Sequence, residues 1–406
     1  MPIQTRLCWA RQNSCLDNVI YVHVPFCRSF CTYCDFYSEV AAKCRKADEA
    51  MKQEALFGDF AEALAEEATL RSGEITNQVN TLYIGGGTPS VLPLAAFTRL
   101  LDALRSAGHN CQFDEFTVEV NPEDIVEKGP AYVEGLMKLG VNRVSMGVQS
   151  FDDEILRFMN RRHNAEAAVT AYAVLEEAGV KNISIDLIFG LPQLSSQRWR
   201  ETVDKALNIS SLGNLPKHIS SYQLSVEPGS MLAKLVERGA WKEAEEGQCQ
   251  EQYSILCEML GSAGYNHYEI SNFAQPGYEA KHNSAYWRHI PYVGLGPGAH
   301  SMKSSDSSIE RRWNREDLAA YIKEPLSVQD GETLTEEQVA LEKIMLGLRT
   351  SLGVRESYLR AHCDKAELEK TLRSGNLEPI FVEGHCSLRI PENRFFISDA
   401  IICSLV

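Results

Sequence analysis

The chain has 406 residues, of which 44% are hydrophobic and 23% are charged, a composition that argues against collagen, coiled coil and wholesale disorder. Its 40 basic and 55 acidic residues give a formal net charge of −15, which argues against a nucleic-acid binder and a polybasic membrane protein. No apolar run approaches the roughly 18 residues of a membrane-spanning helix, so we expect no integral membrane segment.

Residues 1–17 are predicted to form an N-terminal tail, because they lack the apolar core of a secretory signal. Arg6 and Arg11 precede the first acidic residue, Asp17, and a short organellar presequence is therefore the alternative. Twelve cysteines in 406 residues are too sparse for a disulfide scaffold. We therefore expect a reducing compartment, most simply the cytosol.

Residues 18–240 repeat one pattern: a short apolar run, a loop and a helix-like stretch. The predicted strands are 19–24, 81–84, 116–120, 141–146, 183–189 and 219–226. The predicted helices are 47–71, 93–107, 130–139, 152–178 and 197–210. Apolar strands that alternate with helices predict a parallel α/β sheet buried on both faces. Because polar residues follow the carboxyl ends of the strands, a partial (β/α)6 barrel is favoured over a doubly wound sheet.

The pattern changes after residue 240. Residues 241–315 are predicted to extend the barrel, with a helix near 242–263 and then a Gly- and His-rich stretch. Residues 316–406 are predicted to form a smaller, mostly helical domain of the winged-helix type, because helices precede what reads as a small hairpin. Its helical patterns lie near 335–349, 355–361 and 364–374, and its two short apolar runs at 380–382 and 395–398.

Three cysteines follow the first predicted strand at the spacing C-x3-C-x2-C: Cys27, Cys31 and Cys34. Structural zinc usually takes four ligands in paired clusters, and no second Cys/His pair stands at that spacing. Three soft thiolates suit a [4Fe–4S] cluster that leaves one iron open to a further ligand. Buried structural thiols are the alternative for these three, and the favoured interpretation for the remaining cysteines.

This cysteine spacing resembles that of the radical S-adenosylmethionine (SAM) superfamily, whose cluster loop follows the first barrel strand. The resemblance implies that SAM binds the open iron through its amine and carboxylate. It also implies that an electron from the cluster releases a 5′-deoxyadenosyl radical from SAM, which requires an electron donor as a partner.

Several glycines and polar residues at strand ends are similar to the SAM-binding motifs of that superfamily. Consecutive glycines let a backbone approach a ligand closely, a carboxylate can bind ribose hydroxyls, and a guanidinium can clamp a carboxylate. Taken singly, each is equally a turn or a solvated loop charge. The resemblance implies a SAM-binding set of Tyr21, Gly86, Gly87, Thr88, Glu119, Gln149, Arg161 and Asp186.

The stretches GGGTP, EVNPE, GVNRVSMGVQSF and IDLIFGLP together resemble the coproporphyrinogen III oxidase-like branch of the superfamily. That branch contains oxygen-independent oxidases, which decarboxylate propionates, and haem chaperones. The oxidase motif continues to a fourth cysteine where this chain has Phe36, and oxidases carry a long extension where 26 residues precede Cys27. We expect a haem chaperone without oxidase activity; the alternatives are the oxidase and a radical enzyme with another substrate.

Residues 282–287, HNSAYW, match the H-N-x-x-Y-W motif that this resemblance associates with haem. The His282 imidazole can ligate iron, and flat aromatic rings can cover the macrocycle. The alternative is a His282 that hydrogen-bonds within its loop, with His267, His289 and His300 as nearby candidate ligands. The partners implied are haem, client haemoproteins and the electron donor, with a homodimer as a further expectation.

Overall fold

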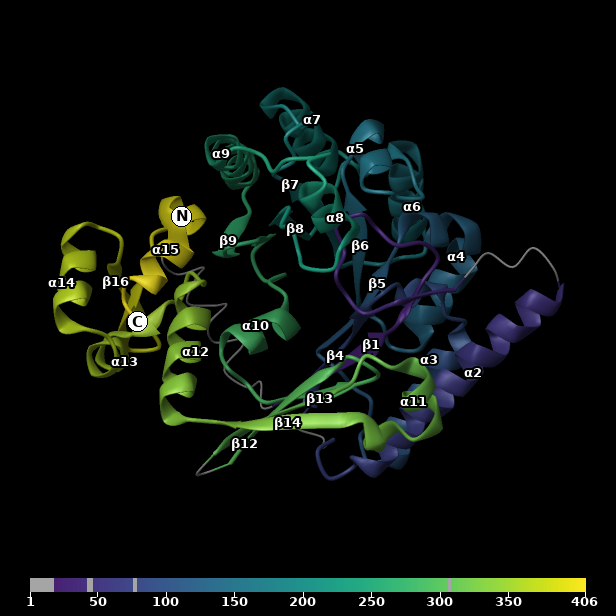
Figure 1. Ribbon diagram of the computed structural model, residues 1–406. Helices are drawn as coiled ribbons and strands as arrows, with labels where there is room; N and C mark the ends of the chain where they lie inside the picture. The colour runs from purple at the N-terminus through teal and green to yellow at the C-terminus, as the bar shows by residue number, and fades with distance from the viewer. Residues whose placement is uncertain (1–17, 42–46, 76–78, 306–307) are drawn as a thin grey trace.

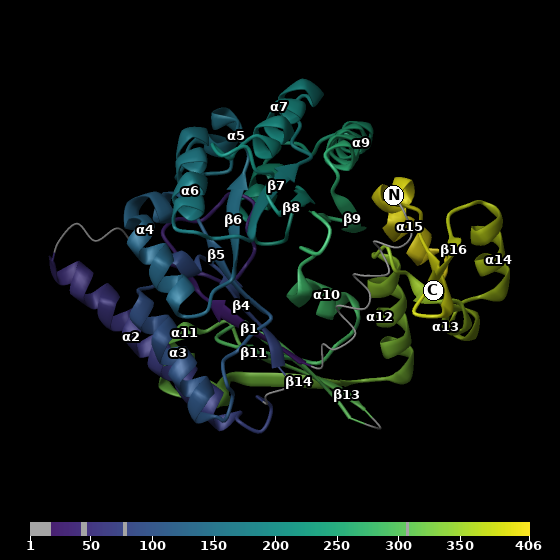
Figure 2. The ribbon, with the colours of Figure 1, turned by 180° about the vertical axis from the view of Figure 1, so that it is seen from behind.

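The structure, a computed structural model, describes residues 18–41, 47–75, 79–305 and 308–406. The predicted tail 1–17 and three of the cysteines, Cys8, Cys15 and Cys44, lie outside these residues. Six parallel strands with helices on their outer face form the main body (Figures 1 and 2). These strands are β1 (Asn18–Val24), β4 (Val79–Gly86), β5 (Glu115–Val120), β6 (Arg143–Gln149), β7 (Ile183–Phe189) and β8 (His218–Gln223). The predicted partial (β/α)6 barrel is confirmed.

The outer helices follow the prediction except at two places. They are α2 (Ala47–Leu70), α3 (Leu94–Ser106), α4 (Pro122–Lys138), α5 (Asp153–Phe158), α6 (Ala165–Glu177) and α7 (Ser196–Leu207). The helix predicted at 130–139 begins earlier, at Pro122, with a kink at Gly129. The helix predicted at 152–178 is two helices, because Asn160 takes a left-handed conformation (φ 57°) and Asn164 caps α6. The break between them carries Arg161.

The sheet continues on both sides of the six strands. Beside β1 lies a parallel strand, β11 (Tyr292–Leu295), followed by antiparallel β12 (His300–Ser304), β13 (Ile309–Asn314) and β14 (Gln329–Leu334). Beside β8 lie β10 (Asn272–Ala274) and β9 (Asn266–Glu269). Helices α8 (Met231–Glu237) and α9 (Glu246–Ser262) connect β8 to β9, and α11 (Leu318–Lys323) precedes β14. The predicted domain limits within 241–406 stay predictions.

The C-terminal region lies to one side of the barrel (Figure 1). It holds α12 (Glu336–Leu348), α13 (Glu356–His362), α14 (Lys365–Arg373), α15 (Ser398–Cys403) and the strands β15 (Val354–Arg355), β16 (Glu378–Val382) and β17 (His385–Arg389). The predicted hairpin exists, but its second strand is β17 and the run 395–398 is helical. Glu383 and Gly384 both have positive φ, which closes a two-residue turn directly after β16.

The barrel strands alternate between an apolar outer face and a polar inner face. Along β6 the outward residues Val144, Met146 and Val148 are buried against the helices, whereas the inward positions carry Arg143, Ser145, Gly147 and Gln149. A short helix, α10 (Lys281–Trp287), lies at the amino ends of these strands. Its first two backbone N–H groups donate to the carboxylate of Glu115, the first residue of β5. The barrel is therefore open at its carboxyl end and covered by α10 at the other.

No helix within the described residues is long and apolar enough to cross a membrane.

Candidate cluster and cofactor site

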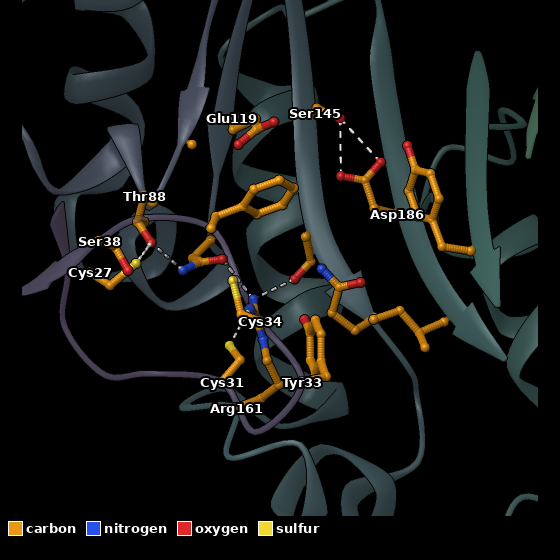
Figure 3. Close-up of a pocket in the computed structure, with 18 of the residues that line it drawn as sticks. Cys27, Cys31, Tyr33, Cys34, Ser38, Thr88, Glu119, Ser145, Arg161 and Asp186 are labelled. Atoms are coloured by element: carbon orange, nitrogen blue, oxygen red, sulfur yellow. Dashed lines mark hydrogen bonds between the residues drawn. The ribbon is translucent and has the colours of Figure 1, made fainter. Parts of the chain in front are cut away.

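The main pocket opens at the carboxyl ends of the barrel strands and has a volume of about 590 Å³. Its wall combines the loop that follows β1 with residues from β4 to β8 (Figure 3). Ten of the residues predicted from the sequence line it: Cys27, Cys31, Cys34, Gly86, Gly87, Thr88, Glu119, Gln149, Arg161 and Asp186. The volume is typical of small-molecule and cofactor sites. The fold thus gathers at one mouth residues that span more than 150 positions of sequence.

The three cysteines are free thiols on the pocket wall. Cys27 ends the short strand β2 (Phe26–Cys27), and its sulfur lies 3.4 Å from the Thr88 hydroxyl. Cys31 accepts a hydrogen bond at 3.4 Å from Nη1 of Arg161. Burial raises the pKa of the Cys27 thiol and raises that of Cys34 to about 12. Without a metal the Cys27 and Cys34 sulfurs therefore favour the thiol form.

The sulfurs are not yet gathered into one coordination sphere. Cys27 lies beside Thr88, away from Cys31 and Cys34, which lie beside Arg161 (Figure 3). Among the described residues no three His, Cys, Asp or Glu side chains are grouped closely enough to hold a metal ion. The donor set itself, three thiols on a single loop, is the one that a [4Fe–4S] cluster takes. The residues therefore fit the cluster.

Arg161 connects this loop to the barrel. Besides its contact with Cys31, its Nη2 donates to Asn121 Oδ1 at 2.6 Å and to the carbonyl of Gly147 at 2.7 Å. The break between α5 and α6 places the side chain there. The Arg161 guanidinium therefore both contacts the cysteine loop and lines the pocket.

The glycine turn after β4 is shaped by close backbone contacts. Gly86 has a φ of 103°, and a Cβ on it would lie 2.6 Å from the His23 ring. A Cβ on Gly87 would lie 2.7 Å from the carbonyl oxygen of Phe26. The amide of Thr88 donates to that same carbonyl. The glycines are thus required for the turn to pack against the cysteine strand, whether or not they also contact a ligand.

Two half-buried carboxylates, Glu119 and Asp186, face the pocket from the middle of the barrel. Glu119 accepts a hydrogen bond from the Tyr83 hydroxyl, and Asp186 accepts one from Ser145. Burial raises the pKa of Glu119 to about 7, despite the Tyr83 hydrogen bond, and also raises the pKa of Asp186. Such partly desolvated acceptors can bind the hydroxyl or ammonium groups of a ligand.

Gln149 ends β6 in an unusual backbone conformation. Its φ is 65°, and the pairing between β6 and β7 shifts register between Gly147 and Gln149. A non-glycine residue with positive φ is strained and persists where the surroundings enforce it. The bulge turns the Gln149 side chain back over Gly147 and into the pocket.

Two predicted residues, Tyr21 and His282, are not among those that line the pocket. The Tyr21 hydroxyl lies 3.0 Å from Nδ1 of His23, inside the wall. His282, on α10, is buried beneath the floor of the pocket. Its Nδ1 lies 2.8 Å from the Thr81 hydroxyl and its Nε2 lies 3.1 Å from the Tyr286 hydroxyl.

Burial, reinforced by the positive charge of Arg143, lowers the pKa of His282 to about 3, so the imidazole is neutral at physiological pH. A neutral imidazole is the form that ligates iron.

Several pocket residues were not predicted from the sequence, among them Asn121, Arg143, Ser145, Ser220 and Asn283. A signal for two of them was present. In RVSMGVQ, residues 143–149, every second residue is polar or glycine, which marks the inner face of a strand. Asn283 belongs to the H-N-x-x-Y-W motif, but nothing local places α10 beneath the barrel.

Known proteins resemble this chain along most of its length. Residues 21–206 match the family model of the radical SAM superfamily. A protein from Synechocystis sp. described as heme chaperone HemW is 32% identical over 364 residues, covering 88% of this chain and 85% of the relative. A second, from Lactococcus lactis, is 34% identical over 339 residues and covers 83% of both chains. The chain belongs to the HemW family of the radical SAM superfamily.

A solved structure extends the likeness of this HemW-family chain to the fold. It is the coproporphyrinogen III oxidase HemN of Escherichia coli, described as a radical SAM enzyme, with a TM-score of 0.73. The superposition covers 100% of this chain and 93% of that chain, at 21% identity. The likeness shows the fold alone. Membership of the superfamily implies a [4Fe–4S] cluster and SAM, and the residues of this pocket fit both.

Proposed function

We propose that this HemW-family protein binds haem and transfers it to haemoproteins, and that it carries a [4Fe–4S] cluster and SAM. The observation that carries the proposal is the identity, above 30% over more than four fifths of the chain, to proteins described as haem chaperones. Phe36 supports it, because this exposed side chain stands where the oxidases have a fourth motif cysteine.

The cluster would be held by Cys27, Cys31 and Cys34. When bound, it supplies a one-electron reduction of the SAM sulfonium. The role of this chain is to hold the cluster at the pocket mouth and to keep the neighbouring Arg161 guanidinium, 3.4 Å from the Cys31 sulfur, facing it. A positive charge beside a thiolate favours the ionised sulfur that iron requires.

SAM would lie against the glycine turn and the two half-buried acids. Gly86, Gly87 and Thr88 offer backbone contacts, while Glu119 and Asp186 accept hydrogen bonds from its ribose or ammonium groups. Gln149 and Arg161 would bind the polar methionyl end near the cluster, with Tyr21 supporting the wall. A ligand carboxylate on Arg161 competes with the Cys31 and Asn121 contacts that this guanidinium now makes.

Haem would be ligated by His282. In the structure both ring nitrogens already have partners, and the side chain is buried. Iron ligation by Nε2 therefore requires that the Tyr286 hydroxyl is displaced and that α10 moves outward. The alternative ligands differ in position: His267 is buried between Phe273 and Phe395, whereas His300 is exposed and stacks on Trp313.

The expected partners are client haemoproteins, an electron donor to the cluster and a second copy of the chain. The expected compartment is the reducing cytosol, with the organellar presequence as the alternative.

Two assays on anaerobically reconstituted protein test the function. A haem titration followed by absorbance is expected to show saturable binding, with a changed spectrum or affinity in His282→Ala. Coproporphyrinogen, incubated with SAM and a strong reductant, is expected to remain unconverted. His385→Ala, at an exposed position of β17, is the matched control and is expected to bind haem like the wild type. Robust protoporphyrinogen formation with stoichiometric SAM cleavage would establish the oxidase instead.

A further inference from the structure

The pocket is deeper than the predicted cofactor residues require. Gln149 and Arg143 stand at the two ends of β6, and both line it. Six residues of extended strand span roughly 20 Å. The upper level, near the cysteines, carries the glycine turn, Glu119 and Gln149. Ser145 and Ser220 lie in register with Glu119 and Asp186. Below them, Arg143 and, from α10, Asn283 form a second level.

The Arg143 guanidinium in this lower level forms no hydrogen bond with another described residue, although Glu115 and Asp186 lie close enough to interact with its charge. The side chain is 2% exposed, yet none of the hydrogen bonds or ion pairs among the described residues involves it, and its Nε is buried without an acceptor. Directly across the β5–β6 ladder, the buried hydroxyl of Thr117 also lacks a partner. A guanidinium carries five N–H donors, and leaving them unpaired in the interior is costly.

The nearest acids do not satisfy Arg143. Both oxygens of Glu115 accept backbone N–H groups of α10, from Lys281 at 2.8 Å and from His282 at 3.0 Å. Asp186 accepts hydrogen bonds from the Ser145 and Ser184 hydroxyls. Neither carboxylate accepts a hydrogen bond from Arg143 among the described residues, so the guanidinium N–H groups remain available to the cavity.

The charges around Arg143 select the kind of ligand. His218 and His282 are buried against it and neutral, because burial and the Arg143 charge both lower their pKa. Arg143 is therefore the single cation at this level of the described chain. Since Glu115 and Asp186 contribute negative charge close by, a doubly charged phosphate is disfavoured. A single carboxylate matches the fork bidentately.

We propose that Arg143 and Asn283 form a second ligand subsite beneath the SAM residues, which binds the carboxylate of another molecule. The carboxylate has two candidate sources: a free small acid and a propionate of a porphyrin. If Arg143 instead binds the methionyl carboxylate of SAM, the lower level is part of the cofactor site and the proposal is wrong. The subsite requires the pocket but does not require haem transfer. The experiments on the subsite and on haem transfer can therefore fail independently.

Binding of carbon-13-labelled propionate to the full-length protein, followed by NMR titration, tests the subsite. We expect saturable binding that weakens at least tenfold in Arg143→Met and partly recovers in Arg143→Lys. The matched control is Arg162→Met, which removes another pocket arginine that is paired with Glu123 and should leave propionate binding unchanged. An unchanged circular dichroism spectrum and an unchanged thermal unfolding transition verify that Arg143→Met is folded.

Two further comparisons identify the source. Weaker haem binding in Arg143→Met, without an effect on haem dimethyl ester, would support the subsite and assign the carboxylate to a porphyrin propionate. An unchanged haem affinity, together with the loss of propionate binding, would assign it to a free acid. If Arg143→Met weakens SAM but not decarboxylated SAM, the carboxylate is the cofactor's own and the second subsite is refuted. Equal propionate binding in Arg143→Met and wild type would refute it as well.

Discussion

The hydroxyl of Tyr83 donates a hydrogen bond to Oε1 of Glu119 at 2.7 Å. On its other side the Tyr83 ring lies over the His282 imidazole, with 5.0 Å between the ring centroids and an interplanar angle of 30°. One side chain thus contacts both a predicted SAM residue and the predicted haem ligand. The two sites share a wall, although 163 residues separate Glu119 from His282 in sequence.

Replacement of Tyr83 by phenylalanine separates these two contacts. We expect Tyr83→Phe to weaken SAM binding about fivefold, because Glu119 loses a donor worth about 1 kcal/mol, while the ring over His282 remains. Equilibrium dialysis with labelled SAM measures the change. Tyr132→Phe, which removes a hydroxyl bonded to the Leu92 carbonyl outside the pocket, is the control. Equal SAM affinity in the two variants would separate Tyr83 from the cofactor.

Loss of one cluster cysteine should remove the cluster. After anaerobic reconstitution we expect about four irons and four sulfides per wild-type chain. In Cys31→Ala the characteristic absorbance should be lost, because two thiolates do not hold the cubane. Iron and sulfide analysis provides the measurement. Cys363→Ala, which removes a free thiol of the C-terminal region, should retain full iron content. A complete cluster in the Cys27/Cys31/Cys34 triple mutant would rule out the assignment.

Removal of the Tyr286 hydroxyl should strengthen haem binding. This hydroxyl lies 3.1 Å from Nε2 of His282 and competes with iron for that nitrogen. If His282 is the ligand, Tyr286→Phe should tighten haem binding roughly fivefold, as expected for a competing hydrogen bond of about 1 kcal/mol. Tyr292→Phe is the control, since this residue touches the Tyr286 ring edge but not His282. Weaker or unchanged affinity in Tyr286→Phe would point to another ligand.

Stability should fall as pH rises because of Glu269. This residue is fully buried at the end of β9, where it forms a bridge with Thr350 of the C-terminal region. Burial raises the pKa of its carboxyl from 4.5 to about 7, and the groups that face it are Tyr222, Tyr253 and Tyr268. Between these two pH values the folded state binds a proton that the unfolded state has lost. The free energy of unfolding therefore decreases as pH rises through this window.

Ionisation of Glu269 lowers the free energy of unfolding by at most roughly 3 kcal/mol between pH 4.5 and 7. Denaturant unfolding at a series of pH values measures it. Other buried acids also make the free energy of unfolding depend on pH. The informative quantity is therefore the difference in this free energy between wild type and Glu269→Gln, which should become smaller as pH falls. Glu310→Gln, at an exposed position of β13, should follow the wild-type curve. A pH-independent difference for Glu269→Gln would show that the carboxyl is ionised in the folded protein.

The local patterns of the sequence were sufficient for the barrel and for the cysteine loop. The apolar periodicity of a strand or helix depends on which of its faces is buried. This periodicity is visible within a few consecutive residues. All six predicted strands overlap the observed ones. The single helix predicted at 152–178 was wrong because the capping ability of Asn164 was not weighed against a continuous helical pattern. The run 395–398 is apolar for a different reason than expected: Phe395 is buried against His267 in a helical turn.

The sequence by itself determined which residues stand at the barrel mouth, because parallel strands bring their carboxyl ends together wherever the helices between them lie. Only the tertiary structure decided what lies at the other end. The Thr81–His282 contact joins residues 201 positions apart, and it buries an imidazole that the sequence alone left open between ligand and core. It also decided that Arg143 faces a cavity without a hydrogen-bond partner among the described residues. Burial and pairing of a side chain depend on which distant segment packs against it, and no local periodicity records that choice.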